Sequence, residues 1–591
     1  MIRNQRYSHV QQFQTKREGL LTGREQHHRF GVARRGGPIV LLLSLAMLAF
    51  GANAASATTA SKTLLPAFTC TAQCSAPPSA ISAPSPESKG RWGERTVAAN
   101  ADLNADGIND VWVADPFATV GTTLEAGKVY LVSGASLVTS SSTPTTPNVI
   151  YTLTAPTPVS HGHFGFVISN IGDVNGDAKP DLAVGVDAND PTTGASTGNG
   201  NVWVYDGTNA VANTPIYTID NPTATSGERF GSRIGKAGDI YNTASGASGA
   251  YVTPTGVTPV VTGDGKSEII VGASKAASGA GVAYIFDGNP AAYPAPSNSS
   301  STTLPNGTFA APNGGSFGLS VQGPGDFNGD GVPDLLISAP AETVGGLTSA
   351  GAIYVYSGYN ILAAHTLLQT IHDPVAQAGA FFGFQDVTPN SPGDVNTDGK
   401  ADIYAEGWKQ NVTVGTVTTS HQGEAWVFAG TATAGTTNTP LLTIDDKHPH
   451  IGGQFGWSMT STTKGNTPTP VMLIGASPHD GATTNEDGGA YLYTSSTGAW
   501  DTDLPLPQGY QQGTTSTDQG PNLGWTVSAP GKLDAANPTY QTYVAGAPFV
   551  DNTSPTPPTQ DEGLIFTFWG PTYAHAYCEP TSTGAPTGTC V

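Results

Sequence analysis

An acidic nine-residue pattern that recurs along the chain constrains the fold more than any other feature of this sequence. Its fullest form, Asp326-Phe-Asn-Gly-Asp-Gly-Val-Pro-Asp334, places oxygen-bearing side chains at positions one, three, five and nine. The pattern recurs at Asp102–Asp110 and Asp394–Asp402, and again at Asp173–Asp181, where Ala178 replaces the glycine of position six. Asp, Asn and Gly also dominate solvated turns, but turn chemistry alone does not explain the same four offsets in four loops.

These loops have the ligand chemistry of a calcium site. Calcium prefers carboxylate and carbonyl oxygens, and three carboxylates on so short a loop repel one another without a cation. An EF-hand is not expected, because its twelfth residue is a Glu on a helix, whereas position twelve here lies in an apolar run typical of a strand. The sequence therefore predicts about four structural calcium sites, with the seventh residue adding a backbone carbonyl. The predicted ligands are Asp102, Asn104, Asp106, Ile108, Asp110, Asp173, Asn175, Asp177, Lys179, Asp181, Asp326, Asn328, Asp330, Val332, Asp334, Asp394, Asn396, Asp398, Lys400 and Asp402.

Each acidic loop belongs to a longer unit of short β-rich runs. In the fourth unit these runs are Gly315–Val321, Leu335–Pro340, Gly351–Tyr356 and Leu367–Ile371, which indicates four strands. Seven marker residues begin the units, and their period is about 72 residues. A closed ring leaves only short strand edges, so the pattern predicts an all-β, seven-bladed β-propeller of four-stranded antiparallel blades over residues 90–572. The markers are Trp92, Phe164, Phe230, Phe317, Phe382, Phe455 and Leu523.

Three units depart from the full acidic loop. In the third, Asp239 is followed by a Gly/Ala/Ser/Thr-rich insertion and then by Asp264-Gly-Lys-Ser-Glu268, and these residues would close a further site if the insertion loops out. The sixth unit has Thr462–Thr469 in place of the loop, and the seventh keeps only Asp534. Neither of these two units is expected to bind calcium.

With these motifs the sequence resembles the FG-GAP repeats of integrin α-chain β-propellers and their bacterial relatives. The Phe-Gly and Gly-Ala-Pro motifs that give the family its name have three counterparts here. They are Phe317-Gly318 with Ser338-Ala339-Pro340, Phe230-Gly231 with Gly272-Ala273-Ser274, and Phe455-Gly456 with Gly475-Ala476-Ser477-Pro478. In the fifth unit, Glu406-Gly407-Trp408 stands where Gly-Ala-Pro is expected. The resemblance implies a secreted or cell-surface calcium-binding module for adhesion, which engages a protein or glycan ligand on one propeller face.

The N-terminal region predicts export. Residues 1–54 combine an arginine-rich start, the apolar run Pro38–Phe50 and small residues after it, which is the layout of a signal peptide. Arg34-Arg35 leaves both general and twin-arginine export open. No second long apolar run follows, so no membrane span is expected in the mature chain. Residues 55–89 are predicted to be an Ala/Ser/Pro-rich linker, in which a segment within 60–75 supplies the outer strand missing from the last blade.

Four cysteines flank the repeats. Cys70 and Cys74 precede them, and Cys578 and Cys590 lie in a C-terminal tail of residues 573–591. In an exported chain such cysteines predict disulfides. The two local pairs are favoured, and a bridge between the two ends of the ring stays open as an alternative.

The net charge of the chain and its short motifs limit the classes of function that the sequence fits. A net charge of −21 with only 24 Lys and Arg residues argues against a nucleic-acid partner. The Gly-x-Ser-x-Gly sequences at 194–198 and 314–318 lack the strand-to-helix context of a nucleophile elbow. The pairs His161/His163 and His448/His450 fit solvated loops better than a metal site. A binding module is therefore favoured over an enzyme, and the alternative is an exported hydrolase acting on polysaccharide or another polymer at the propeller face.

Overall fold

The computed structural model divides the chain into two compact units, Met1–Cys74 and Ser75–Val591, and every described residue belongs to the second unit. The predicted signal peptide, residues 60–75 and all four cysteines lie outside the described residues. The description covers residues 78–569 except 140–143, 187–199, 209–212, 241–263, 289–304, 306, 360, 362–364, 385–390, 415–416, 447–451, 464–469, 478–487, 505–521, 535–540 and 551–561.

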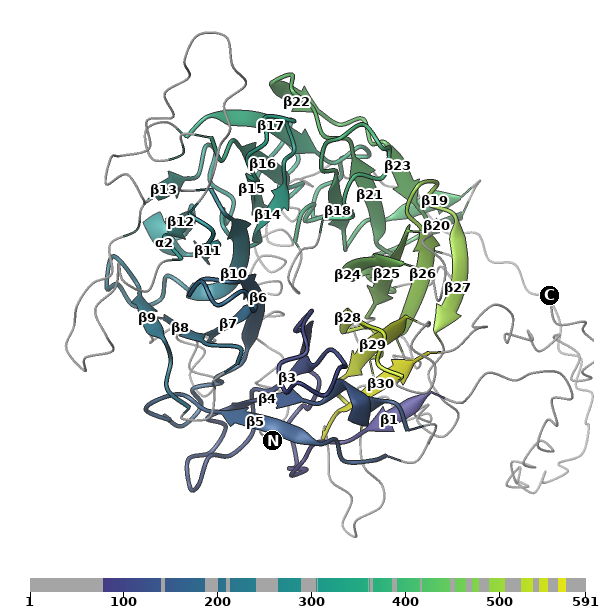
Figure 1. Ribbon diagram of the computed structural model, residues 1–591. Coiled ribbons are helices and arrows are strands. Elements are labelled where there is room, and N and C mark those ends of the chain that lie inside the picture. Colours follow the sequence, from purple (N-terminus) through teal and green to yellow (C-terminus); the bar gives the residue numbers. More distant parts are fainter. Residues whose placement is uncertain are drawn as a thin grey trace, which may run out of the picture. The chain divides into compact units, whose positions relative to one another are not determined.

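The second unit is a seven-bladed β-propeller, as the repeat pattern predicts, and blade numbers here follow the sequence units (Figure 1). Within a blade each strand pairs antiparallel with the next strand along the chain. Blade 1 contains β2 (Arg95–Ala98), β3 (Val111–Asp115), β4 (Lys128–Val132) and β5 (Val149–Leu153). Blade 2 contains β6 (Val167–Gly172), β7 (Asp181–Gly185), β8 (Asn201–Tyr205) and β9 (Tyr217–Asp220). Blade 3 contains β10 (Phe230–Gly238), β11 (Glu268–Ala273), β12 (Val282–Phe286) and β13 (Gly307–Ala310). Blade 4 contains β14 (Val321–Gly325), β15 (Asp334–Ala339), β16 (Ala352–Tyr356) and β17 (Leu367–His372).

The later blades vary this arrangement. Blade 4 is extended by β22 (Gly435–Thr437), which runs parallel to β17. The described strands of blade 5 are β18 (Ile403–Gly407), β21 (Glu424–Phe428) and β23 (Leu442–Ile444), and β19 (Val412–Val414) pairs with β20 (Val417–Thr419) as a separate hairpin. Blade 6 contains β24 (Phe455–Thr463), β25 (Pro470–Ala476), β26 (Gly489–Thr494) and β27 (Trp500–Leu504). Blade 7 contains β28 (Thr526–Gly531), β29 (Thr542–Ala547), β30 (Leu564–Phe568) and β1 (Ser79–Ile81).

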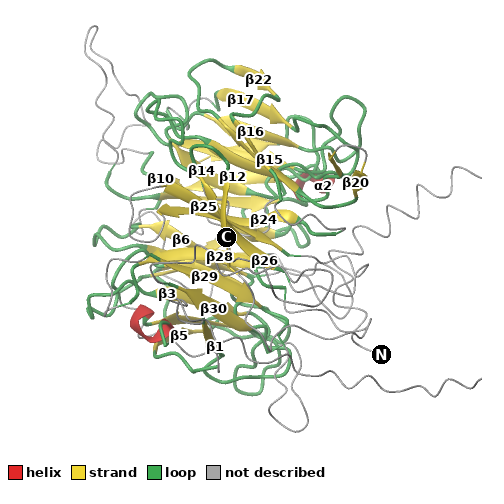
Figure 2. Cartoon of the chain, turned by 90° about the vertical axis from the view of Figure 1, so that its right-hand side faces the viewer, coloured by secondary structure: helices red, strands yellow, loops and turns green. Residues whose placement is uncertain are grey.

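Helical structure in the described residues is limited to a 3₁₀ turn, η3 (Gly134–Leu137), and a short turn, α2 (Ala276–Gly279). None of the described helices has the length and apolar character needed to cross a membrane. Because neighbouring strands are antiparallel, the acidic loops after the first strands lie at one end of the blades. The connections between second and third strands, and those between successive blades, lie at the other end. Figure 2 shows the loops at these two ends of the strands.

The hydrophobic core is divided among the junctions between blades. Among the described residues, seven buried clusters occur, and each combines residues of two adjacent blades. The seven marker residues are all fully buried in these clusters. The apolar surfaces of neighbouring sheets therefore stabilise each other, and no blade has a separate core of its own.

A glycine before each third strand lets adjacent blades approach closely. All seven of these glycines have positive φ, between 72° and 93°. A Cβ atom on any of them would lie only 2.0–2.3 Å from a backbone oxygen of the next marker residue. No side chain is tolerated at such a distance, so glycine is required at each junction, the closing one included. These glycines are Gly127, Gly200, Gly281, Gly351, Gly423, Gly488 and Gly563.

The ring is closed by β1, which pairs antiparallel with β30 as the outer strand of blade 7 (Figure 1). An N-terminal strand was expected here, but its predicted position at residues 60–75 is wrong for this edge, because Ser79–Ile81 fills it. All three residues of β1 are buried, and the Trp92 indole N–H donates to the carbonyl of Ile81 at 3.2 Å. Residues Ser79–Ile81, toward the end of the predicted linker, thus form a strand of the propeller.

Replacing Ile81 by Ala tests this closure. Ile81 is fully buried between blades 7 and 1. Large-to-small substitution at such a site leaves a cavity, so we expect a loss of about 2–4 kcal/mol in the free energy of unfolding. Val375→Ala is the control, because Val375 is 53% exposed and its loss should change stability by less than about 0.5 kcal/mol. Equal unfolding midpoints in denaturant for the two variants would contradict this role of β1.

Candidate metal sites

In the four complete acidic loops, the aspartate of position nine is buried at the start of the second strand. One of its carboxylate oxygens accepts the backbone N–H of position two, at 2.8–2.9 Å. The other accepts the N–H of a glycine beyond the third strand, at 2.9–3.2 Å. The position-nine residue therefore joins the loop to two strands of its blade. These aspartates are Asp110, Asp181, Asp334 and Asp402.

The side chains of positions one, three and five fold back over the loop. In the fourth unit, the Asp326 carboxylate accepts the N–H groups of Asp330 and Gly331 at 3.1 and 2.8 Å. The Asn328 side-chain oxygen also accepts the N–H of Asp330, at 2.8 Å, and Asp330 accepts that of Val332, at 2.9 Å. The other three loops repeat these bonds. Backbone donors thus orient all the predicted side-chain ligands in the same way in four blades.

Position six explains why alanine is accepted in the second unit. Gly107, Gly331 and Gly399 have φ of 86–88°, and nothing lies within 4 Å of a Cβ built on any of them. Ala178 adopts the same left-handed region, with φ 64°. The substitution therefore carries the cost of the backbone conformation and no steric clash.

The predicted position-seven ligands are placed by their own N–H groups, which donate to the position-five carboxylates at 2.8–3.0 Å. Neighbouring loops are also connected to each other. The Ala401 N–H donates to the Asp326 carbonyl at 2.8 Å, and Lys179 Nζ donates to the Asp102 carbonyl at 2.9 Å. The acidic loops of adjacent blades are therefore joined by hydrogen bonds.

Burial changes the protonation of the position-nine carboxyls. Burial, reinforced by nearby carboxylates, raises the pKa of Asp181 and Asp334 to about 7 and that of Asp110 to about 6, against the opposing effect of their backbone hydrogen bonds. The pKa of Asp402 is raised for the same reasons. A divalent cation would offset both the burial and the repulsion. Three carboxylates and one amide on each loop are hard oxygen donors, so these residues fit calcium.

The third unit brings its dispersed acidic residues together. Oxygens of Asp239, Asp264 and Glu268 all lie within 4.8 Å of one another. Glu268 accepts the N–H of Ile240 at 2.6 Å, and Asp239 accepts that of Gly265 at 3.0 Å. These bonds match those of positions nine and one in the complete loops, although residues 241–263 separate the two halves. The three predicted ligands therefore lie close together, and their binding of calcium stays a prediction.

Two buried oxygens in this third-unit cluster lack hydrogen-bond donors within the described part of the chain. Among the described residues, neither Asp239 Oδ1 nor Glu268 Oε1 has a hydrogen-bond partner. Burial, followed by the charges of Asp239, Asp287 and Asp264, raises the pKa of Glu268 to about 9. A buried carboxylate oxygen without a donor is unfavourable, and coordination to calcium would satisfy it.

The seventh unit lacks this chemistry. The Leu533 N–H donates to the Thr542 hydroxyl at 3.2 Å, so Thr542 replaces the aspartate of position nine. Lys532 then stands at position one and Asp534 at position three. A lysine in place of the first carboxylate is unsuited to a cation. In the sixth unit, residues 464–469 lie outside the described residues.

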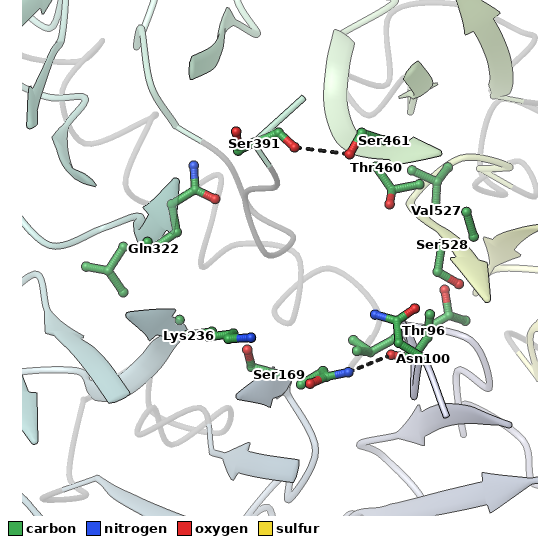
Figure 3. A pocket seen from close by; sticks show the side chains of 17 residues that line it. Thr96, Asn100, Ser169, Lys236, Gln322, Ser391, Thr460, Ser461, Val527 and Ser528 are labelled. Carbon is green, nitrogen blue, oxygen red and sulfur yellow. Dashed lines mark hydrogen bonds between the residues drawn. The ribbon is translucent and has the colours of Figure 1, made fainter. Parts of the chain in front are cut away.

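A cavity of about 330 Å³ lies on the propeller axis (Figure 3). Side chains from all seven blades line it, mostly through hydroxyl and amide groups. Neither carboxylates nor imidazoles occur among the described residues of its lining, and Lys236 is the charged residue there. One lining residue per blade is Thr96, Ser169, Lys236, Gln322, Ser391, Thr460 and Ser528.

One buried carboxyl outside the loops predicts a dependence of stability on pH. Among the described residues, neither oxygen of Asp115, at the end of β3, has a hydrogen-bond partner. Burial and then the charge of Glu87 raise its pKa to about 8, while Lys128 lowers it. Because the folded state holds this proton up to a higher pH than the unfolded state does, stability should fall as pH rises from about 4 to about 8.

Asp115→Asn should remove that contribution. Relative to the wild-type protein, we expect the variant to gain about 2 kcal/mol or more in unfolding free energy between pH 5 and pH 8.5. Denaturant unfolding in saturating calcium at both pH values measures the difference, and calcium keeps titration of the loops out of the comparison. The same pH dependence in both proteins would show that Asp115 does not titrate in this range.

Similarity to known proteins agrees with this architecture. The FG-GAP repeat family matches residues 164–205 and 317–356. Each match runs from a marker residue to the end of a third strand, in blades 2 and 4. Over 145 residues the chain is also 30% identical to integrin alpha-PS5 of Drosophila melanogaster, a match that covers 24% of this chain and only 13% of that integrin. The protein is therefore a seven-bladed β-propeller that contains FG-GAP repeats.

Proposed function

We propose that this protein is an exported, calcium-binding propeller that acts as a ligand-binding or adhesion module. The observation that supports calcium is the repeated loop geometry, together with the three carboxylates of the third unit within 4.8 Å of one another. The similarity to an integrin α chain supports ligand binding. Export is supported by the N-terminal sequence pattern, and the ligand class is a protein or a glycan.

The arrangement of the loops suggests that the two ends of the blades have different roles. The calcium loops stiffen one end, where their backbones also connect adjacent blades. The opposite end carries the connections between second and third strands and between blades, whose sequences differ from unit to unit. Variable loops on a rigid scaffold are the usual location of a binding site. We therefore assign ligand binding to that end.

The hydrolase alternative is less well supported. It needs a pair of carboxyl groups at a cavity that a polymer can enter. The axial cavity presents hydroxyls, amides and one amine among its described lining residues. The carboxylates of the four acidic loops and of the third-unit cluster instead share one hydrogen-bond pattern.

Calcium counting tests the first half of the proposal. Isothermal titration calorimetry of the purified, calcium-stripped protein should give about five sites, with Kd on the order of 10⁻⁴ M or tighter. Asp326→Asn and Glu268→Gln should each remove one site, whereas Asp534→Asn should remove none. A stoichiometry that is unchanged in the first two variants would refute the assignment.

Binding to arrays of glycans and extracellular-matrix proteins, run with calcium and with chelator, tests the second half. A hydrolase panel on the same substrates is run in parallel. We expect saturable binding to one ligand class in calcium and no turnover. Turnover without saturable binding would favour the hydrolase.

A further inference from the structure

Three side chains with metal-ligand chemistry meet where blade 1 joins blade 2, at the end of the blades opposite the acidic loops. Glu125 lies in the connection between β3 and β4, and His161 and His163 lie between β5 and β6. Glu125 Oε2 is 2.8 Å from His161 Nδ1 and 3.6 Å from His163 Nε2. One potential ligand atom from each of the three residues lies within 4.8 Å of the other two.

The backbone holds these residues in place. The His161 N–H donates to the Leu124 carbonyl at 2.9 Å, and the His163 N–H donates to the Glu125 carbonyl at 3.1 Å. The Phe164 N–H continues the series to Ala126 at 2.9 Å. The two segments are therefore fixed to each other through main-chain bonds, whatever their side chains bind.

The His163 imidazole is buried, but its hydrogen-bonding capacity is not used by the described residues. It is 2% exposed, and among the described residues neither of its ring nitrogens has a hydrogen-bond partner. The Phe117 ring packs against it, with 4.4 Å between centroids, and the Arg91 guanidinium lies 4.3 Å from the centre of Phe117. The sequence favoured a solvated histidine pair, and this is wrong for His163. A buried imidazole with two unbonded nitrogens lacks a partner that a metal ion would supply.

The repeats themselves show that His161 is unusual. It stands three residues before its marker, at φ 59°. Among the described residues, four other units have glycine at that place, with φ of 73–88°: Gly227, Gly314, Gly379 and Gly452. The first unit has Lys89 there, at φ 70°. Non-glycine residues are disfavoured in this conformation, so a histidine here calls for a compensating interaction of its side chain.

We propose that Glu125, His161 and His163 bind one Zn²⁺ ion, with a water molecule completing the coordination. Two imidazoles and one carboxylate suit zinc, whereas calcium prefers oxygen ligands alone. In a tetrahedral zinc site, ligand atoms lie about 3.3 Å apart, and the two distances from Glu125 fall on either side of that value. The side chains of His161 and Glu125 are 25% and 15% exposed, so solvent reaches the site. The ion would join blade 1 to blade 2.

Zinc titration of the calcium-saturated protein tests the proposal, with His161→Gly as the main variant. Five of the other six units have glycine at this position in the sequence, so the variant should fold. Lys89→Gly makes the matched change in the first unit and serves as the control. We expect the wild-type protein and the control to bind zinc at one site at least about tenfold more tightly than His161→Gly or Glu125→Gln does. Zinc should raise the unfolding temperature of the first two proteins only.

A purely structural role predicts a different result. If His161 acts only through its ion pair with Glu125, His161→Gly will lower the unfolding temperature equally with and without zinc, and that outcome overturns the proposal. Anomalous diffraction at the zinc edge gives an independent measurement. A peak between Glu125, His161 and His163 is expected, and its absence from zinc-soaked crystals overturns the site.

Discussion

Replacement of Gly351 by Ala should destabilise the propeller by at least about 3 kcal/mol, more than most single substitutions do. A Cβ at this position would lie 2.3 Å from the carbonyl oxygen of Phe382 and 2.7 Å from its amide nitrogen. Both atoms are backbone of blade 5, and Phe382 is fully buried, so neither can move without opening the junction. The left-handed conformation of Gly351, at φ 91°, adds a second penalty for any other residue.

Gly331→Ala is the matched control. It makes the same change at φ 88°, but nothing lies within 4 Å of the added Cβ. The second unit already has alanine at this position, as Ala178. We therefore expect a loss of about 1 kcal/mol or less. Denaturant unfolding of both variants in saturating calcium separates steric overlap from backbone strain, and similar losses would disprove the close-approach argument.

The fold could be predicted from the repeat, because each unit marks the limits of its strands with characteristic residues. The buried markers, such as Phe317, and the glycines before the third strands define the strands without reference to tertiary contacts. The strand that closes the ring was harder to predict from the sequence. A strand of three residues, Ser79–Ile81, is too short to show the two-residue period of a strand, and its place is decided by pairing with Ile565–Thr567. Composition alone favours a segment within residues 60–75 instead.

The candidate sites also differ in how far the sequence could predict them. The complete loops are local in sequence, so the spacing of Asp326, Asn328, Asp330 and Asp334 was enough to predict them. The third-unit cluster was only partly visible, because an insertion separates Asp239 from Asp264. The cluster of Glu125 with His161 and His163 depends on the packing of two blades. Glu125 is 36 and 38 residues from the two histidines, and no local pattern connects it to them.

Removal of calcium is expected to have the largest effect of all on stability. A ligand that binds only the folded state adds about 2.7 kcal/mol per site when its free concentration is a hundred times Kd. With about five sites the total is on the order of 10 kcal/mol, which is comparable to the whole free energy of unfolding of a typical domain. We therefore expect chelator to lower the unfolding temperature by well over about 10 °C, and excess calcium to restore it.

The electrostatics of the loops give this prediction a second, independent part. Without calcium, the carboxylates of each loop repel one another, and salt at about 1 M, where the screening length falls to about 3 Å, weakens that repulsion. Raising the concentration of sodium chloride should therefore stabilise the chelated protein more than the calcium-loaded protein. Asp326→Asn, which removes one carboxylate, should reduce the calcium-dependent part of the stability by about one fifth, if the sites contribute equally. Differential scanning calorimetry of wild-type and variant proteins, with calcium or chelator at two salt concentrations, measures both effects. An unfolding temperature that is indifferent to chelation would mean that backbone hydrogen bonds alone hold the loops, and that the alternating carboxylates have no ion to bind.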